Sequence, residues 1–203
     1  RWGADWEDVL TRHGYIVACC DGRGTGFRGE QFKKGTYADL GHREYEDQLS
    51  FARYLATLPY VDKSRIGIYG WSYGGFMALN CALHGDGLFK MAIAVAPVTS
   101  WRYYDTIYTE IYNGLPQDNP KGYDDNSPIN FAEGLSPRTS LLIIHGTGDD
   151  NVHFQNTVEM VRALNRAGKQ FDLAIYPDDN HSMVPAGGTH VRNRMVRYTL
   201  ENL

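Results

Sequence analysis

The sequence predicts an α/β fold built on a doubly wound, mostly parallel sheet, and three observations lead to it. Short apolar, β-prone segments alternate with longer segments of helical period. Residues 66–69 run through a glycine-rich turn directly into a helical pattern at 73–84. The segment 141–144 is apolar at every position, which is typical of a strand buried on both faces. Successive strand–helix–strand units of this kind place parallel strands side by side.

The predicted elements follow one another in a regular order. The strands are expected at residues 15–20, 66–69, 91–96, 141–144 and 172–176. The helices are expected at 43–57, 73–84, 154–167 and 190–202, after a short amphipathic helix at 6–12. We expect the chain to enter this architecture partway, without the N-terminal strands of the sheet. Residues 97–138 are longer than a simple connection needs, and we expect this excursion to build a substrate pocket.

The composition is that of a single folded domain spanning residues 1–203. With 42% hydrophobic and 22% charged residues, the chain can bury a substantial core. The net charge of −4 and the lack of a basic cluster argue against nucleic-acid or anionic-membrane partners, so we expect a small substrate. The apolar runs are strand-sized, and the three cysteines give no disulfide framework. The histidines have no partners at metal-ligand spacing, so no metal or other cofactor is predicted.

One serine stands in the sequence context of a nucleophile elbow. The segment Gly70-Trp71-Ser72-Tyr73-Gly74-Gly75 lies between a predicted strand and a predicted helix, which exposes the Ser72 hydroxyl at a sharp turn. We expect Gly70 and Gly74 to be needed for the close approach of strand and helix. A Gly-x-Ser-x-Gly match is weak evidence in a chain with 22 glycines, because many serines cap helices. An acid and a base must therefore be found elsewhere.

The acid and the base are predicted in loops that follow two later strands. Asp149 comes after the strand at 141–144, and His181 comes after the strand at 172–176. Serine, aspartate, histidine is the chain order of the α/β-hydrolase triad, in which the histidine takes the serine proton and the carboxylate fixes the histidine tautomer. The plainer alternative makes Asp149 a helix cap and His181 a solvated loop residue. The joint order favours the triad.

Other residues near these loops are weaker candidates. The pattern alone does not choose between Asp149 and Asp150, and Asp178 and Asp179 share the loop of His181. We interpret His145 and His153 as structural, because they precede or crowd the acid instead of occupying a separate loop after it.

A glycine-rich segment early in the chain also requires an interpretation. Gly24-Thr25-Gly26-Phe27-Arg28-Gly29 matches a dinucleotide-binding pattern, but residues 30–41 lack the helical period that such a site needs. We therefore reject a dinucleotide site and interpret Asp21-Gly22-Arg23-Gly24 as a tight structural loop at the top of the sheet.

Three aromatic residues follow the strand at 91–96. Trp101, Tyr104 and Tyr108 have the spacing of one helix face, which places their rings together. Flat aromatic rings can form the walls of an apolar pocket, whereas the alternative is a stripe that faces the core. Their position at the carboxyl end of a strand favours a pocket.

Taken together, these segments resemble the C-terminal hydrolase domain of the dipeptidyl peptidase IV branch of the prolyl oligopeptidase family. The stretches that carry the resemblance are Asp21-Gly22-Arg23-Gly24-Thr25-Gly26, Gly70-Trp71-Ser72-Tyr73-Gly74-Gly75, Ala94-Val95-Ala96-Pro97-Val98, Trp101 with Tyr103-Tyr104 and Tyr108-Thr109-Glu110, and His145-Gly146-Thr147 with Asp149-Asp150-Asn151-Val152-His153-Phe154. They are spread over nearly the whole chain. The departure is Ser182-Met183, where a glycine is more usual after the histidine.

The resemblance implies a role for each of a small set of residues. The implied catalytic residues are Ser72 as nucleophile, Asp149 in preference to Asp150 as acid, and His181 as base, with the backbone N–H of Tyr73 in the oxyanion hole. Asn151 is implied to hold a substrate carbonyl. The implied proline pocket consists of Tyr73, Val98, Trp101, Tyr104 and Tyr108. The implied activity is release of N-terminal dipeptides after proline or alanine.

The resemblance also implies parts outside this sequence. Family members carry a β-propeller, whose glutamates hold the substrate amino terminus, and a tyrosine that completes the oxyanion hole. We therefore expect this chain to belong to a longer protein, with homodimerisation and a periplasmic or extracellular location as further family expectations. The alternatives are a tripeptidyl peptidase, an acyl-peptide hydrolase or a carboxylesterase of the same fold, or a non-catalytic hydrolase-fold module.

Overall fold

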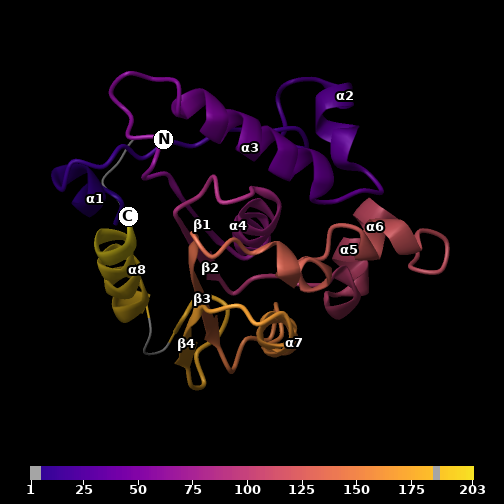
Figure 1. Ribbon diagram of the computed structural model, residues 1–203. Coiled ribbons are helices and arrows are strands. Elements are labelled where there is room, and N and C mark those ends of the chain that lie inside the picture. Colours follow the sequence, from indigo (N-terminus) through magenta and orange to yellow (C-terminus); the bar gives the residue numbers. More distant parts are fainter. Residues whose placement is uncertain (1–5, 185–187) are drawn as a thin grey trace.

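A four-stranded parallel sheet forms the centre of the computed structural model, which describes residues 6–184 and 188–203 (Figure 1). Its strands are, in spatial order, β1 (Gly67–Trp71), β2 (Met91–Val95), β3 (Ser140–Gly146) and β4 (Asp172–Tyr176). Trp71 is paired with Val95, and Val95 with Ile144, so the carboxyl ends of these strands meet at one edge. The predicted α/β fold with a parallel sheet is confirmed.

Helices cover both faces of the sheet, as a doubly wound fold requires. The longer ones are α3 (His42–Leu55), α4 (Tyr73–His84), α5 (Thr106–Asn113), α7 (Gln155–Arg166) and α8 (Gly188–Asn202), and the short ones are α1 (Asp8–Arg12), α2 (Glu30–Lys33) and α6 (Pro120–Asp124). Figure 1 shows α4 and α7 on one side of the sheet and α8 on the other. Ile143 packs in the layer of α4 and α7, whereas Ile144 packs in the layer of α8. Because successive strand residues point to opposite faces and both faces are covered, the centre of β3, residues 141–144, is apolar at every position.

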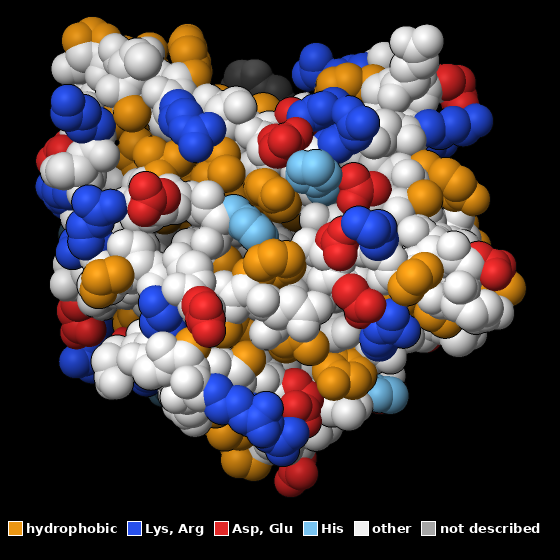
Figure 2. Space-filling view, turned by 45° about the vertical axis from the view of Figure 1, so that its right-hand side comes forward, with side chains coloured by type: hydrophobic (Ala, Val, Ile, Leu, Met, Phe, Trp, Pro, Cys, Tyr) orange, Lys and Arg blue, Asp and Glu red, His pale blue; other side chains and the backbone are white. Residues whose placement is uncertain are grey.

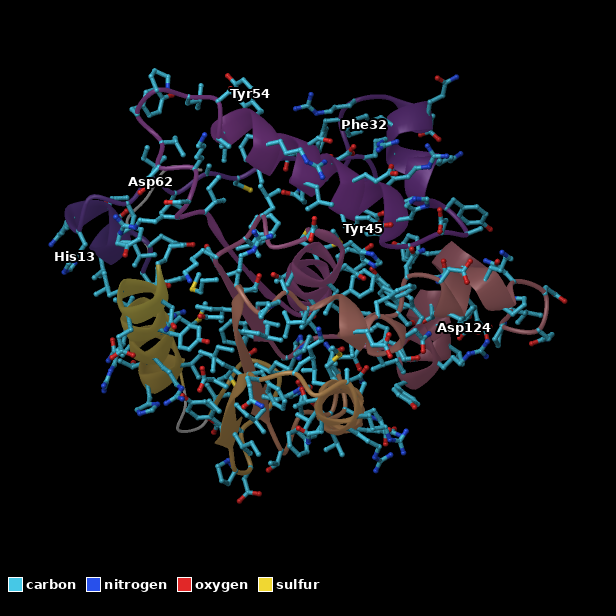
Figure 3. All side chains as sticks on the ribbon, in the orientation of Figure 1. His13, Phe32, Tyr45, Tyr54, Asp62 and Asp124 are labelled. Atoms are coloured by element: carbon cyan, nitrogen blue, oxygen red, sulfur yellow. The ribbon has the colours of Figure 1, made fainter. Side chains whose placement is uncertain are left out.

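An outer helix, α3, packs on α4. Leu49 and Ala52 of α3 lie in one buried cluster with Cys81 of α4. Tyr45 points from α3 toward α4 (Figure 3), where its ring stacks on His84 with the centroids 4.5 Å apart. This packing holds the first turn of α3 against the last turn of α4.

The expected strand at residues 15–20 is wrong. These residues adopt no regular structure, and Ile16 and Val17 are 59% and 42% exposed. A strand needs a hydrogen-bonded neighbour, and within the described residues the sheet ends at β1. Apolar, β-prone sequence supplies propensity but cannot supply the pairing partner. The segment is instead held by contacts such as the bond from Gln48 Nε2 to the Cys20 carbonyl, at 3.0 Å.

The excursion at residues 97–138 is entirely helical or irregular. The 3-10 helices Trp101–Tyr103, Pro128–Asn130 and Ala132–Gly134 accompany α5 and α6. It is tied to the core by Thr99, whose N–H and hydroxyl both bond to Asn156 of α7 at 3.0 and 2.7 Å. The excursion therefore begins from a rigid base directly after β2.

The glycine-rich segment before α2 has the character of a structural loop. The helix that follows, α2, has only four residues, too few for a dinucleotide-binding helix. Arg23 donates from its backbone and its guanidinium to Asp47 of α3, with a shortest contact of 2.7 Å. These bonds bind the loop to α3.

The face of the molecule drawn in Figure 2 is mixed in charge. Figure 2 shows acidic and basic side chains interspersed over the face in view, with small apolar areas between them. None of the helices within the described ranges is both long and apolar enough to span a bilayer.

Candidate active site

Ser72 occupies a backbone conformation that residues with side chains rarely adopt. Its φ and ψ are 60° and −117°, in the turn between β1 and α4. A conformation of this kind costs on the order of 1–3 kcal/mol and persists only where surrounding structure holds it. The Ser72 N–H donates to the Val95 carbonyl at 2.8 Å, and its carbonyl accepts from the Phe76 N–H at 3.0 Å. The predicted strand–turn–helix junction is confirmed.

Two glycines permit the close approach at this turn, and one of them differs from the expectation. A Cβ on Gly70 would collide with the backbone of Gly74, so Gly70 is needed as predicted. Gly74 itself faces open space, so the expectation that it must be small is wrong. Instead, a Cβ on Gly75 would lie 2.7 Å from the Val95 carbonyl oxygen of the neighbouring strand. The sequence motif shows where the glycines are, whereas the tertiary contacts show at which of these positions a side chain would collide.

Tyr73 is the first residue of α4, and both its backbone N–H and its phenol hydroxyl have a place in the site. Backbone N–H groups in the first turn of a helix have no intrahelical acceptor, so the Tyr73 N–H is suited to bind an oxyanion beside Ser72. The phenol hydroxyl donates to Glu44 Oε1 of α3 at 2.6 Å. Glu44 Oε2 in turn accepts from the Gly41 N–H at 3.0 Å. Burial raises the pKa of Glu44, and burial beside that carboxylate raises the pKa of Tyr73 well above its ordinary value.

Asp149 is buried in the loop after β3, and each of its carboxylate oxygens has its own partners. Oδ1 accepts from the backbone N–H groups of Asn151 and Val152, at 3.0 and 2.9 Å. Oδ2 contacts His181 Nδ1 at 2.7 Å and His145 Nε2 at 3.1 Å. The Asp149 side chain has no exposed surface, and both of its carboxylate oxygens are hydrogen-bonded within the protein.

These partners favour the ionised form of Asp149. Burial by itself would raise the pKa of this carboxyl, but the hydrogen bonds from His145, His181 and the Asn151 backbone outweigh it. The net result is a pKa well below the ordinary value for aspartate. An anion at this position can orient an imidazole and stabilise its protonated form.

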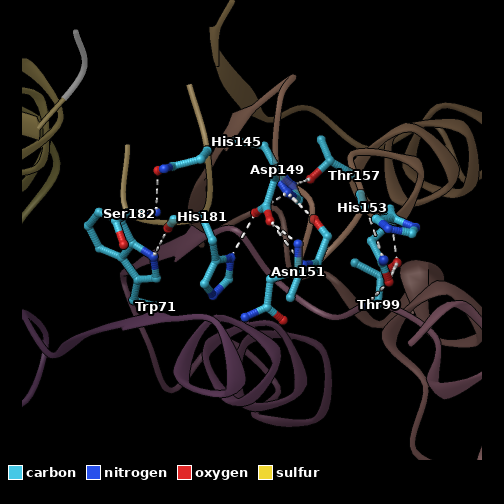
Figure 4. A network of polar contacts seen from close by, with 12 residues as sticks. Trp71, Thr99, His145, Asp149, Asn151, His153, Thr157, His181 and Ser182 are labelled. Atoms are coloured by element: carbon cyan, nitrogen blue, oxygen red, sulfur yellow. Dashed lines mark hydrogen bonds and ion pairs between the residues drawn. The ribbon is translucent and has the colours of Figure 1, made fainter. Parts of the chain in front are cut away.

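His181 lies in the loop after β4, which is packed against the loop of Asp149 (Figure 4). The Thr147 N–H donates to the Tyr176 carbonyl at 2.9 Å, and the Gly148 N–H donates to the Asp179 carbonyl at 3.1 Å. Gly146 permits this contact, because a Cβ there would collide with the Asp179 carbonyl. Close packing of the two loops holds His181 Nδ1 against Asp149.

Trp71 connects the loop of His181 to the turn of Ser72. It directly precedes Ser72, and its indole Nε1 donates to the His181 carbonyl at 3.0 Å (Figure 4). The structure thus brings the loops of Ser72, Asp149 and His181 to the same edge of the sheet. Among the described residues no hydrogen bond joins the Ser72 hydroxyl to His181.

The other acidic residues near the site are placed differently. Asp150 is exposed and makes no hydrogen bond within the described part of the chain, and Asp178 is also exposed. The helix-cap alternative for Asp149 is wrong in its simple form, because α7 begins at Gln155 without a side-chain cap. Its Oδ1 instead stabilises the turn at Asn151 and Val152, while Oδ2 contacts the imidazoles.

Two further histidines differ sharply from each other. His153 is exposed, and only its carbonyl bonds to α7, through the Asn156 amide at 3.1 Å. His145 is completely buried on the carboxylate of Asp149. Sequence reasoning gave both residues the same structural role, because chain position cannot show which ring faces the acid.

The aromatic residues meet, but not on one helix. Trp101 lies in a 3-10 helix that ends at Tyr103, the chain is extended at Tyr104, and Tyr108 belongs to α5. The expectation of a single helical face is therefore wrong. The rings nevertheless meet across this interruption of the helix. The ring of Trp101 stacks on that of Tyr108 with the centroids 6.1 Å apart, and the ring of Tyr104 meets that of Tyr108 edge-on with the centroids 5.3 Å apart. Asp105 stabilises the start of α5 by accepting from the Tyr108 N–H at 2.8 Å.

The residues of the expected pocket differ in how deeply they are buried. Val98 and Trp101 are buried, at 3% and 1% exposure, in a core cluster with Phe76. Tyr73, Tyr104 and Tyr108 are partly buried and pack against that cluster. Val98 and Trp101 thus form a rigid base, and the tyrosines line the surface above it.

Asn151 lies beside these tyrosines. Its Oδ1 accepts from the Tyr104 hydroxyl at 2.7 Å, and no acceptor among the described residues engages its Nδ2 group. Tyr104 and Asn151 help to line an open cavity of about 630 Å³, together with Arg102, Asp105 and His153. The fixed carboxamide is suited to donate to a substrate carbonyl.

Comparison with known proteins agrees with this geometry. The model of the prolyl oligopeptidase family matches residues 2–203. "Probable dipeptidyl-aminopeptidase B" of Trichophyton verrucosum is 49% identical over 177 residues, covering 86% of this chain and 20% of that protein. The protein of the same name from Sclerotinia sclerotiorum is 44% identical over 204 residues, covering 99% of this chain and 22% of that protein. This chain therefore spans about a fifth of the length of these relatives.

A solved structure shows the same likeness in three dimensions. The crystal structure of Porphyromonas gingivalis dipeptidyl peptidase 4 superposes with a TM-score of 0.96 at 47% identity, covering 100% of this chain and 29% of that one. The sequence match, the superposition and the α/β-hydrolase architecture agree over the whole chain. The chain belongs to the prolyl oligopeptidase family, in its dipeptidyl peptidase IV branch.

Proposed function

We propose that this chain is the catalytic domain of a longer serine peptidase that releases N-terminal dipeptides after proline or alanine. The observation that carries the proposal is the contact of Asp149 Oδ2 with His181 Nδ1 at 2.7 Å, on the loop that Trp71 ties to the turn of Ser72. The names of the similar proteins, dipeptidyl-aminopeptidase B and dipeptidyl peptidase 4, support the type of peptidase.

The acylation step follows from the positions of these groups. Asp149 accepts a hydrogen bond from His181 Nδ1–H, which keeps that proton on Nδ1 and leaves Nε2 with the lone pair that takes the Ser72 proton. The Ser72 oxygen then bonds to the substrate carbonyl carbon, and the Tyr73 N–H donates to the oxyanion that forms. His181 returns its proton to the leaving amine as the peptide bond breaks, which gives an acyl-enzyme. Water repeats the sequence and releases the dipeptide.

The aromatic residues account for the proposed specificity. Tyr73, Tyr104 and Tyr108 offer flat walls over the buried base of Val98 and Trp101, which suits a pyrrolidine ring. Asn151 would donate its amide to the carbonyl before the proline. A β-propeller of the longer protein would bind the substrate ammonium and thereby set the peptide length; homodimerisation would belong to that longer protein too.

A substrate panel on the full-length protein tests this proposal. Gly-Pro anilide should be cleaved much faster than an N-acetylated dipeptide anilide, a tripeptidyl anilide or a simple carboxylic ester. A peptidyl phosphonate should label Ser72 alone, and Ser72→Ala should abolish labelling. Faster cleavage of the tripeptide or the ester would reject dipeptidyl specificity, and labelling that survives in Ser72→Ala would reject the nucleophile.

A further inference from the structure

His145 contacts the catalytic carboxylate although it has no place in the three-residue mechanism. It is the sixth residue of β3, it has no exposed surface, and its ring lies edge-on to Phe154 with the centroids 5.6 Å apart. Nδ1 meets the Thr157 hydroxyl of α7 at 2.7 Å. Nε2 meets two oxygens, the Val152 carbonyl at 2.8 Å and Asp149 Oδ2 at 3.1 Å.

The identity of these partners determines where the proton lies. A carbonyl oxygen and an ionised carboxylate oxygen can only accept hydrogen bonds. Nε2 must therefore carry the hydrogen that faces both oxygens. Thr157 can donate its hydroxyl hydrogen to Nδ1, which completes a neutral ring with the proton on Nε2. The imidazole is thus fixed by β3, by α7 and by the Val152 carbonyl.

These contacts of His145 bear on the orientation of the Asp149 carboxylate. Its Oδ1 is fixed by the N–H groups of its own loop, whereas Oδ2 receives N–H donors from two imidazoles, His145 on β3 and His181 on the loop after β4. One of these, His181, must remain able to move a proton during catalysis. The other, His145, is buried and anchored on its far side.

We propose that His145 is a positioning residue, which holds Asp149 Oδ2 in line with His181 Nδ1 through its own Nε2–H. This inference rests on the proposed function, because it assigns a support to the acid of that triad. Without the donor, Oδ2 would keep only the mobile partner, and the carboxylate could rotate away from the direction that fixes the His181 tautomer. The expected loss is therefore in kcat and not in substrate binding.

Three substitutions separate this role from simple packing. His145→Gln places an amide N–H where Nε2 lies, and His145→Asn reaches only the Nδ1 side toward Thr157. His145→Leu fills the space without a donor. In the full-length protein, we expect H145L to lower kcat about 10- to 100-fold, the range for a misplaced catalytic group, with KM nearly unchanged. H145Q should restore most of the kcat, and H145N should not.

A spectroscopic measurement accompanies the kinetics. The downfield proton resonance of His181 Nδ1–H should persist in H145Q and shift or broaden in H145N and H145L. Unchanged kcat in H145L, or equal kcat in H145Q and H145N, would overturn the inference. If H145L does not fold, the comparison of H145Q with H145N decides, since both keep a polar side chain.

A fourth variant separates failure of this inference from failure of the proposed function. Asp149→Asn is assayed alongside in the same protein. If D149N keeps full kcat, the triad itself is wrong. If D149N is inactive while H145L has the wild-type kcat, only the role of His145 is refuted.

Discussion

The two oxygens of Asp149 show how one residue can combine a structural contact with a proposed catalytic contact. Oδ1 closes the turn at Asn151 and Val152, so the loop shape depends on this side chain. Oδ2 faces His181 and His145. The sequence could place Asp149 after a strand, but the choice over Asp150 required the resemblance, and the second imidazole required the structure.

Turnover should therefore distinguish the two neighbouring aspartates. Asp149→Asn should lower kcat by orders of magnitude, up to about 10⁴-fold, because the amide favours the wrong histidine tautomer. Asp150→Asn, at an exposed position, should change kcat little. The measurement is steady-state cleavage of a Gly-Pro anilide by the full-length variants. A larger loss in D150N would move the acid by one residue.

The stability that Asp149 contributes should depend on pH. Its pKa in the folded chain lies below the ordinary value of about 3.9, so its contribution is complete at neutral pH and declines as the pH falls below about 4. The difference in unfolding free energy between wild type and D149N should accordingly shrink from pH 7 to pH 3. Urea unfolding at both pH values measures it. A difference that grows toward low pH would contradict the depressed pKa.

At the scale of elements, the predictable features were those that local sequence determines. β4 and α4 lie where the pattern placed them, and the other core elements differ by a few residues at their ends. The strand at 15–20 failed because pairing is a tertiary property. The aromatic helix failed because the extended backbone at Tyr104 interrupts it, yet the rings still meet. The residue spacing predicted that the aromatic rings are neighbours, but it did not predict the backbone conformation between them.

The glycines of the elbow give a matched pair for testing the packing of α4. Gly75→Ala should destabilise the fold by about 1–3 kcal/mol, because the new methyl group would press on the Val95 carbonyl oxygen. Gly74→Ala should be neutral or stabilising by up to about 1 kcal/mol, because its Cβ meets open space and alanine favours a helix. Chemical denaturation of both variants measures the difference. Equal destabilisation would contradict the geometry of the turn.

The contacts between α5 and the neighbouring 3-10 helix can be tested through specificity. Tyr108→Ala should lower kcat/KM for proline substrates about ten- to hundredfold, equivalent to 1–3 kcal/mol, because a wall that stacks on Trp101 is lost. Ile111→Ala, 60% exposed on the same helix, is the control and should leave kcat/KM unchanged. Unchanged proline selectivity in Y108A would make the aromatic group a core feature only.

At the scale of the whole molecule, the fold brings together proposed catalytic residues that lie far apart in the sequence. Ser72, His181 and Asp149 lie on three loops at one edge of a rigid sheet, and Asn151 stands beside the aromatic walls. The chain nevertheless spans about a fifth of the length of its relatives. In our proposal, the propeller of the longer protein provides the anchor for the substrate ammonium.

The 203 residues alone should therefore cleave peptides poorly. The proposed oxyanion hole obtains one donor from Tyr73, and loss of one donor costs on the order of 10²- to 10³-fold in rate. Loss of the ammonium anchor removes further rate by leaving the substrate poorly oriented. Cleavage of Gly-Pro anilide by the purified chain should thus fall at least about 100-fold below that of the full-length protein. Circular dichroism should first establish that the sheet is folded. A folded chain with nearly full activity would show that both the oxyanion donors and the ammonium anchor lie within these residues.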